Sequence, residues 1–526
     1  MTSIDKATRP GLTQSVHELL NPRVIAMFFL GFSAGIPLLL IFSSLSLWLR
    51  EAGVERHAVT FFSWAALAFS FKFIWAPLID RLPVPLLTRW LGRRRAWLLV
   101  AQISIMAAIL LMAHIDPASN ASSLTRMALA AVLLGFSAAT QDIVIDAYRI
   151  ESAAPRLQAL MSSTYIAGYR IGMVVAGAGA LYLAAWFGSE AGAYNYAAWR
   201  ITYIIMAATM LVGVITTLTI REPVTDRAGE QFYAASDYLR LVAIFAMTAA
   251  TFALVFFYVE AFFSGLKQIA GGAVLTNFLL EVLHFVLAAG IAVLVGWLLV
   301  IMGAINRRMA RDTWLEPALD FFRRYGLKTA LLLLALIGLY RISDIVLGVI
   351  SNVFYQDLGF TKSEIATAVK TFGVFVSIAG GLLGGLLATR YGVMRILMLG
   401  AILSSAAQLI FIALAHAGAN LVMLYIAVGA DNLVAGLASA AFIAFLSSLT
   451  SVSFTAVQYA IFSSLMTLLP KLLGGYSGSV VDGLGYPGFF VFTSLIGVPV
   501  IGLVWLAGRR LRLASQATPS GHTATI

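Results

Sequence analysis

Residues 137–151 read Ser-Ala-Ala-Thr-Gln-Asp-Ile-Val-Ile-Asp-Ala-Tyr-Arg-Ile-Glu, and this stretch places charged side chains inside a long apolar run. The run begins near Met127, and its length predicts the cytoplasmic half of a membrane-spanning helix. An ionised carboxylate near the centre of a bilayer costs roughly 2.5–3.5 kcal/mol. Such a segment is tolerated only where it faces protein or a water-filled cavity. We therefore look for function here first.

The composition of the whole chain is typical of a membrane protein. Of its 526 residues, 60% are hydrophobic and only 11% are charged, and the mean hydropathy is +0.91. Repeated apolar runs predict an all-α polytopic fold, and no polar stretch is long enough for a soluble domain. The net charge of +11 lies in short loops between apolar runs, which is typical of cytoplasmic loops. We expect no nucleic acid partner.

Metal and cofactor chemistry are not indicated by the sequence. The chain has no cysteine, which excludes disulfides, thiolate ligands and cysteine nucleophiles. Its six histidines show no metal-ligand spacing. We expect no metal site, no cofactor and no catalytic residue.

Fourteen apolar runs are long enough to span a membrane. They lie near 24–48, 58–79, 96–114, 125–149, 158–186, 198–220, 239–263, 277–303, 329–355, 363–389, 394–416, 420–447, 454–481 and 487–508. They predict a cytoplasmic segment 1–23, a six-helix bundle 24–222, two extra membrane helices 223–305, a basic cytoplasmic connector 306–328, a second six-helix bundle 329–508 and a cytoplasmic tail 509–526. Residues 80–95 alone hold five arginines, so both termini are expected in the cytoplasm.

Two sequence echoes indicate repeated halves. Leu-Gly-Phe-Ser-Ala occurs at 30–34 and again at 134–138, in the first and fourth predicted spans. The span 420–447, which is the fourth of the second bundle, has Gly429-Ala430-Asp431-Asn432 at the level of Gln141 and Asp142 in the fourth span of the first bundle. Repeated halves with polar groups near mid-depth are typical of alternating-access transporters.

The loop after the second span resembles the signature of the major facilitator superfamily. Asp80-Arg81 is followed by Gly92-Arg93-Arg94-Arg95, and a weaker copy, Gly385…Thr389-Arg390-Tyr391-Gly392, lacks the acidic residue. Asp80 could pair with a loop or helix-end arginine and latch the cytoplasmic ends of the halves. The alternative is ordinary positive charge on a cytoplasmic loop.

A more specific resemblance covers nearly the whole chain. It rests on Leu30-Gly-Phe-Ser-Ala-Gly-Ile-Pro37, Phe71-Lys-Phe-Ile-Trp-Ala-Pro77, Gly92-Arg-Arg-Arg95, residues 137–149, Gly168-Tyr-Arg-Ile-Gly172, Tyr340-Arg341…Asp344, Ala440-Ala-Phe-Ile-Ala444 and Phe454-Thr-Ala-Val-Gln-Tyr-Ala460. Together these resemble the AmpG muropeptide permeases. The resemblance implies proton-driven import of anhydro-muropeptides across the inner membrane, for wall recycling and β-lactamase induction. We expect a monomer in the lipid bilayer, with a sugar-peptide and protons as its partners.

Polar residues within the spans are the candidate site. The substrate-binding candidates are Lys72, Gln141, Tyr169, Arg170, Arg341, Asn432 and Gln458. The proton-coupling candidates are Asp142, which we prefer, and Asp344 and Asp431. The gating candidates are Asp80, Arg81, Asp146 and Arg149, with Glu151 beside them. Asp146 and Arg149 are three residues apart and can pair on one helix face.

Several of these residues have a structural alternative. Lys72 could face the cavity and bind a carboxylate of the substrate. Alternatively, its long aliphatic side chain could carry the ammonium group to the membrane–water interface. Asp142 could carry a proton or form a fixed ion pair with Arg170. Gln458 could bind N-acetyl groups or join two helices.

Other functions remain open at this point. A related transporter could carry acetyl-coenzyme A or another anionic substrate, and a drug exporter is a further option. A membrane-embedded enzyme would need a catalytic constellation, and we find neither His-Glu-x-x-His nor a nucleophile elbow. We expect that the protein is not an enzyme.

Overall fold

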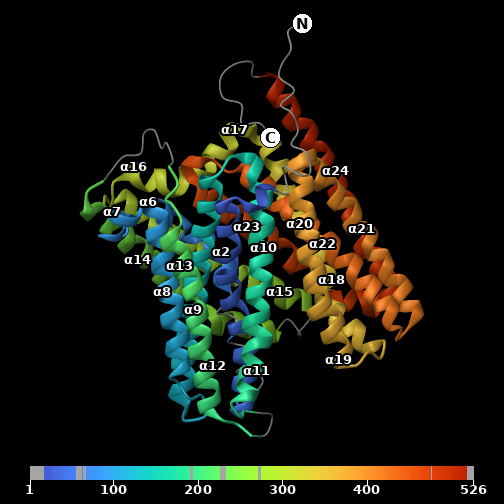
Figure 1. The fold of residues 1–526 in the computed structure, drawn as a ribbon. Coiled ribbons are helices and arrows are strands. Elements are labelled where there is room, and N and C mark those ends of the chain that lie inside the picture. Colours follow the sequence, from blue (N-terminus) through green and yellow to red (C-terminus); the bar gives the residue numbers. More distant parts are fainter. Residues whose placement is uncertain are drawn as a thin grey trace. The chain divides into compact units, whose positions relative to one another are not determined.

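The structure is a computed structural model that describes residues 17–54, 62, 67–189, 193–224, 233–269, 274–474 and 477–517. Every regular element within these ranges is helical (Figure 1). Residues 1–225 and 325–526 form one compact unit, and residues 226–324 form another.

The first six predicted spans correspond to helices of the first unit. In chain order these are α2 (Pro22–Leu39), η2 (Leu40–Ser44) and α3 (Leu45–Glu51); α5 (Leu67–Phe71), η4 (Lys72–Ile74) and α6 (Ala76–Arg81); α7 (Leu87–Leu91) and α8 (Arg93–Ala113); α9 (Ala121–Ser152); α10 (Gln158–Val174), η6 (Val175–Gly179) and α11 (Ala180–Trp186); and α12 (Tyr196–Thr209) and α13 (Leu211–Thr219). We call this group the N-half.

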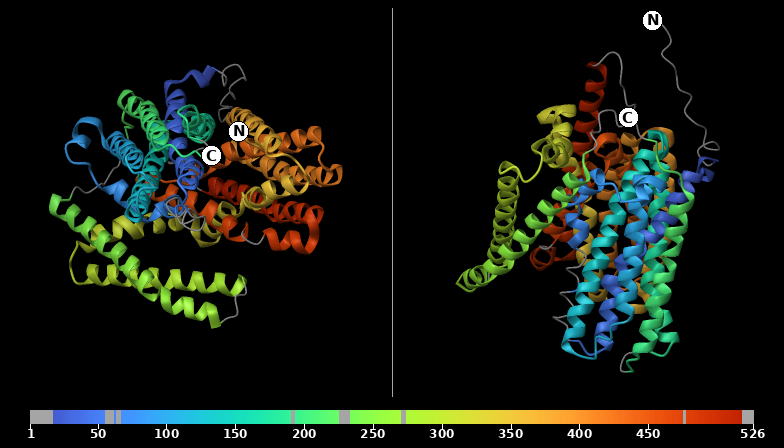
Figure 2. Two further views of the ribbon diagram at one scale, coloured as in Figure 1. Left: turned by 90° about the horizontal axis from the view of Figure 1, so that it is seen from below. Right: turned by 90° about the vertical axis from the view of Figure 1, so that its left-hand side faces the viewer.

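The last six predicted spans correspond to the C-half. Its elements are α17 (Glu316–Leu339), of which the part from residue 325 belongs to this unit, α18 (Ile342–Asp357), α19 (Lys362–Ile365), η8 (Ala366–Phe372), α20 (Gly373–Tyr391), α21 (Val393–Ala417), α22 (Leu421–Leu449), η9 (Val452–Phe454), α23 (Thr455–Gly474) and α24 (Ser477–Ala517). Figure 2 shows the N-half and the C-half as two groups of helices lying side by side.

Twelve described helices are long and apolar enough to cross a membrane. The two predicted spans outside this set are the interrupted segment α5–η4–α6 and helix α23. The protein is therefore an all-α, multi-pass membrane protein, and fourteen spans are compatible with it. Several boundaries differ from the prediction: α17 begins at Glu316 and is separated from α18 at Tyr340 and Arg341, α23 ends at Gly474, and α24 begins at Ser477.

The first span changes its helical geometry because of a proline. Asn21 caps the N-terminus of α2 by accepting a hydrogen bond from the Arg23 amide at 3.0 Å. Pro37 has no amide hydrogen, and a π-type turn, η2, follows it. The hydroxyl of Ser44 in η2 donates to the carbonyl of Ala176 in η6 at 2.7 Å. The irregular turns of the first and fifth spans therefore pack against each other.

Glycines let α2 and α10 approach each other closely. A Cβ at Gly168 would lie 1.9 Å from the carbonyl oxygen of Phe28, and one at Gly31 would lie 2.2 Å from that of Tyr165. Only a residue without a side chain fits at these positions. This contact fixes the depth of α10, and with it the level of Tyr169 and Arg170.

Matching contacts in the two halves support the repeat. The Gln102 side chain in α8 accepts a hydrogen bond from Thr217 in α13 at 2.9 Å, between the third and sixth helices of the N-half. Gln408 in α21 accepts from Thr493 in α24 at 3.4 Å, between the corresponding helices of the C-half. The same type of contact thus stabilises both halves.

The second unit contains a pair of long apolar helices, α14 (Ala235–Ile269) and α15 (Val274–Ile301), which pack side by side (Figure 2). His284 in α15 stacks between Phe256 and Phe263 of α14, and its Nε2 is 2.8 Å from the Phe256 carbonyl. Most other large side chains of α14 are exposed within this structure, including Tyr258. That exposure suits lipid contact.

Candidate functional site

Two helices are interrupted at candidate site residues. The second span changes at Lys72–Ile74, where Pro77 removes a backbone donor at the start of α6. The span 329–355, which is the first of the C-half, is interrupted at Tyr340–Arg341, where Arg341 leaves the helical conformation with φ −101° and ψ 15°. Interrupted helices near mid-depth are typical of substrate sites in transporters. Lys72 and Arg341 therefore lie at comparable irregularities in the two halves.

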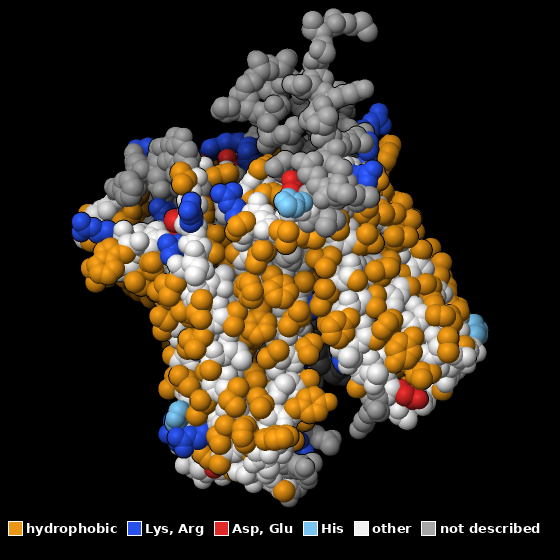
Figure 3. All heavy atoms as spheres, viewed as in Figure 1, with side chains coloured by type: hydrophobic (Ala, Val, Ile, Leu, Met, Phe, Trp, Pro, Cys, Tyr) orange, Lys and Arg blue, Asp and Glu red, His pale blue; other side chains and the backbone are white. Residues whose placement is uncertain are grey.

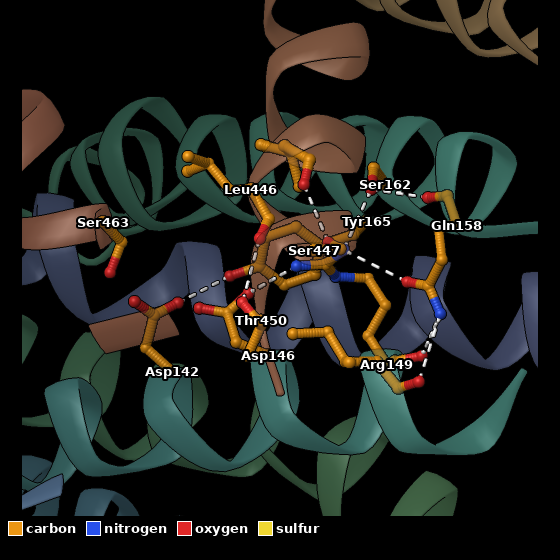
Figure 4. Close-up of polar contacts among 12 residues, drawn as sticks. Asp142, Asp146, Arg149, Gln158, Ser162, Tyr165, Leu446, Ser447, Thr450 and Ser463 are labelled. Atoms are coloured by element: carbon orange, nitrogen blue, oxygen red, sulfur yellow. Dashed lines mark hydrogen bonds and ion pairs between the residues drawn. The ribbon is translucent and has the colours of Figure 1, made fainter. Parts of the chain in front are cut away.

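Lys72 is 4% exposed and is held by two carboxylates of α9. Its ammonium forms an ion pair with Asp142 and lies 3.6 Å from the nearer carboxylate oxygen of Asp146. The hydroxyl of Tyr165 in α10 donates to the other oxygen of Asp142 at 2.7 Å (Figure 4). Asp142 therefore pairs with Lys72 rather than with Arg170, and Lys72 turns toward α9 rather than toward an interface.

Arg149 lies one turn beyond Asp146 and is completely buried. Its guanidinium lies 3.1 Å from Asp146 and donates to the hydroxyl of Ser162 in α10 at 3.1 Å. It also donates to Ser447 in α22 at 2.6 Å (Figure 4). The guanidinium lies over the ring of Tyr459, 5.1 Å from its centroid. Arg149 thus joins the N-half to the C-half.

A second charged group joins the halves nearer the helix ends. Arg94 at the start of α8 forms ion pairs with Asp80 at 2.7 Å and with Glu151 at 2.6 Å. Asp80 also accepts from the amide of Val457 at 3.1 Å, and the hydroxyl of Thr455 donates to Glu151. The N-terminus of α23 is therefore bound by carboxylates of the N-half. We call these five residues the latch.

Gly92 allows the N-terminus of α8 to be capped by a distant carboxylate. Glu222, just beyond α13, accepts from the amides of Arg94 at 2.8 Å and Arg95 at 3.0 Å. Gly92 adopts φ 86°, and a Cβ there would lie 2.3 Å from the Glu222 side chain. The cap fixes the position from which Arg94 reaches the latch.

Further ionisable candidates form a looser group. Arg170 in α10 and Arg341 at the start of α18 are partly exposed, and their like charges interact across the two halves. Arg341 lies 3.8 Å from Asp344. Asp431 in α22 is partly exposed, and the charges of Asp344 and Arg341 act on its carboxylate. It has no hydrogen bond or ion pair within the described residues. Tyr169 precedes Arg170 and is partly exposed.

The polar amide candidates are mostly enclosed by protein. Gln141 is fully buried, and neither of its amide atoms has a partner among the described residues. Asn432 donates to the Val428 carbonyl of its own helix at 2.9 Å. Gln458 is 1% exposed and accepts from the Ser451 amide at 2.8 Å, which caps the turn before α23. Arg81 ends α6 and is partly exposed.

Among the described residues, the hydrogen bonds of charged side chains that join the halves lie toward the end where α8 begins. They come from the C-terminal parts of α6 and α9, the end of α22 and the start of α23. Figure 3 shows the surface hollowed between the halves toward the opposite end, where α11 and α12 lie. These contacts between the halves and the hollow therefore lie toward opposite ends of the helices.

Sequence reasoning missed several partners in these contacts. Tyr165 and Ser447 carry no charge that would set them apart in the sequence. Thr455 lies in the quoted stretch Phe454–Ala460, but nothing there indicates a contact with Glu151. Glu222 follows an apolar helix directly, which could have indicated a helix-end contact. Pro77 could have indicated the interruption at Lys72.

The chain is similar to known transporters over most of its length. The sequence model of the Major Facilitator Superfamily matches residues 23–347. An Escherichia coli protein named anhydromuropeptide permease is 28% identical over 520 residues, which cover 97% of this chain and 86% of that protein. A Rickettsia conorii protein with the provisional name transporter AmpG 4 is 29% identical over 479 residues, covering 91% and 95%.

Solved structures agree on the fold. The proton:xylose symporter XylE bound to 6-bromo-6-deoxy-D-glucose superposes with a TM-score of 0.54 at 12% identity, covering 94% of this chain and 96% of that one. The E. coli fucose:proton symporter FucP gives 0.53 at 12% identity, covering 92% and 97%. The chain therefore belongs to the major facilitator superfamily of membrane transporters.

Proposed function

We propose that the protein imports anhydro-muropeptides from the periplasm to the cytoplasm with protons, by alternating access. The import would serve cell-wall recycling and, through it, β-lactamase induction. The observation that carries the substrate class is the similarity to the E. coli anhydromuropeptide permease over 97% of this chain. In this proposal the protein lies in the inner membrane with residues 1–23, 306–328 and 509–526 in the cytoplasm.

The charged groups at mid-depth support an anionic sugar-peptide as substrate. Arg170 and Arg341 come from opposite halves, repel each other and are partly exposed. An anion between them would relieve that repulsion, and a guanidinium can bind a carboxylate in a bidentate manner. The lactyl or peptide carboxylate of a muropeptide supplies such a group. We propose that these two arginines bind it.

Two aspartates compete for the role of proton carrier. The sequence favours Asp142 because of its position, yet its carboxylate is neutralised by Lys72 in this structure. Asp431 has no ion pair within the described residues, so ionising it at membrane depth is costly. Protonation of Asp431 would remove that cost. Release of Lys72 from Asp142 would instead create a second proton site when the halves move.

In the proposed cycle, the structure corresponds to the state that is closed toward the cytoplasm. The latch and the Arg149–Ser447 contact would hold the halves together at this end. Substrate and a proton would enter from the periplasmic side and change the charge balance at mid-depth. The halves would then rock about the site and open the latch.

The direct test is uptake of labelled anhydro-muropeptide by the purified protein in proteoliposomes, with and without an inward proton gradient. We expect the gradient to raise uptake severalfold. Unlabelled muropeptide should compete, whereas acetyl-coenzyme A and a cationic dye should not. Stronger competition by acetyl-coenzyme A, or uptake indifferent to the gradient, would contradict the substrate or the coupling respectively.

Asparagine variants distinguish the two carriers. Substitution of the true carrier, Asp142→Asn or Asp431→Asn, should abolish gradient-driven uptake while exchange of labelled for unlabelled substrate continues. Asp116→Asn is the matched control, because among the described residues Asp116 forms its hydrogen bonds with Tyr194 and with nearby loop groups of the N-half. If both variants keep full dependence on the gradient, neither residue carries the proton.

A further inference from the structure

A groove on the N-half lies outside the site described above. It is lined by the first turns of α2, the end of α9 and the end of α13 with the segment that follows it, and its volume is about 1300 Å³. That volume exceeds the typical 300–1000 Å³ of a small-molecule site. The groove could therefore hold a large amphiphile.

Two uncommitted cations lie at this groove. Arg23 and Arg221 both line it, both are exposed, and neither side chain forms an ion pair within the described part of the chain. The acidic residues of the lining are already engaged: Glu151 binds Arg94, and Glu222 caps α8. The groove therefore offers positive charge to an anion.

The side chain of Tyr148 also lines the groove. It is 2% exposed. Among the described residues its hydroxyl makes no hydrogen bond, although the charge of Arg23 acts on it. A phosphate oxygen bound near Arg23 could accept a hydrogen bond from this hydroxyl.

Several exposed side chains of the lining are apolar. Ile25, Phe29 and Ile215 are 41%, 42% and 60% exposed. Exposed apolar side chains beside two arginines match a ligand with an anionic head and a hydrocarbon tail. We propose that this groove binds one anionic phospholipid, with its phosphate held by Arg23, Arg221 and Tyr148 and an acyl chain along α2 and α13.

Such a lipid would contact the helix end that carries the latch. Glu151 lines the groove and is also the carboxylate shared by Arg94 and Thr455. Tyr148 precedes Arg149, which joins the halves. Lipid occupancy therefore stabilises this end of α9. The proposal requires a membrane around the chain but does not depend on the muropeptide assignment.

The test measures lipid binding to the full-length purified protein by native mass spectrometry. Phosphatidylglycerol is titrated against phosphatidylcholine, and we expect one phosphatidylglycerol site with at least about tenfold preference. Arg23→Gln with Arg221→Gln should remove the preference, and Tyr148→Phe should weaken binding about fivefold. Arg395→Gln and Tyr182→Phe, which change exposed residues outside the groove, should leave it unchanged.

A second measurement identifies the occupant directly. A photo-crosslinking amino acid at position 215 in phosphatidylglycerol proteoliposomes should give a lipid adduct. A crosslink to the chain itself or to a second copy would overturn the proposal. So would equal binding of the two lipids, unchanged binding in the double arginine variant, or displacement by millimolar inorganic phosphate. Uptake of muropeptide plays no part in either readout.

Discussion

The guanidinium of Arg149 in α9 donates a 2.6 Å hydrogen bond to the hydroxyl of Ser447 in α22, across 298 residues of chain. Both groups are buried, so this bond joins the N-half and the C-half away from water. Asp146 balances the charge of Arg149 on the same helix. The contact between the halves therefore depends on a charge that belongs to the same cluster as Lys72.

Loss of one charge of the buried pair Lys72–Asp142 should destabilise the fold, whereas transport should require both charges. Lys72→Gln leaves Asp142 and Asp146 with one cation fewer, and we expect a loss of about 3–5 kcal/mol in stability. The double variant Lys72→Gln with Asp142→Asn should recover most of that loss without recovering uptake. Thermal unfolding in detergent measures the first effect, and proteoliposome uptake the second. An equally unstable double variant would show that the two side chains do not act as a pair.

Weakening the latch should open the end where α8 begins. Asp80→Asn removes the charge that binds Arg94 and the Val457 amide. Charge-assisted hydrogen bonds contribute about 1.5–3 kcal/mol each, so the closed state should lose at least about tenfold in population. The chain has no cysteine, so Thr450→Cys, at an 8% exposed position, provides a single reporter. Its rate of maleimide labelling should rise in the Asp80→Asn background and stay constant with Asp116→Asn.

The close contact of α2 and α10 should tolerate no side chain. Gly168→Ala places a methyl group 1.9 Å from the Phe28 carbonyl, so the helices must separate. We expect a stability loss of about 1–3 kcal/mol or more. Gly502→Ala in α24 is the matched control, because no atom outside the adjacent residues and the neighbouring backbone of its own helix lies within 4 Å of its Cβ position. The unfolding temperature should fall for the first variant and stay level or rise for the second; equal behaviour would refute the packing argument.

The stability of the N-terminus of α19 should depend on pH because of Glu364. The Thr361 amide donates to its carboxylate at 2.8 Å, as does the Thr361 hydroxyl, and both bonds hold the pKa of Glu364 below its usual value. A lowered pKa means that the ionised form contributes stability at neutral pH, and that this contribution disappears as the pH falls through the folded-state pKa. The difference in unfolding temperature between the wild type and Glu364→Ala should therefore be larger at pH 7 than at acidic pH. A difference that does not shrink on acidification would show that the charge is irrelevant.

Local sequence was sufficient for the helices and for contacts within one helix. Apolar runs of about 20 residues need membrane-spanning helices because the backbone must be satisfied internally in lipid. The fifth predicted span, 158–186, coincides with α10 to α11, and most others agree within a few residues. Helical periodicity also predicted the pairing of Asp146 with Arg149. It further required Gln141 and Asp142 to point about 100° apart, and only Asp142 meets Lys72.

Tertiary structure alone decided which helices supply the partners. Lys72 lies 70 residues from Asp142, and the sequence instead suggested Arg170 as the partner of that carboxylate. Nothing in the region of Gln458 indicated that its carbonyl would bind the Ser451 amide. Periodicity states which face of a helix carries a side chain, but packing selects the helix that this face meets. Membrane helices of similar hydropathy do not differ enough in sequence to reveal which of them pack together. Close contacts in the folded protein, such as that of Gly168 with Phe28, determine which helices are neighbours.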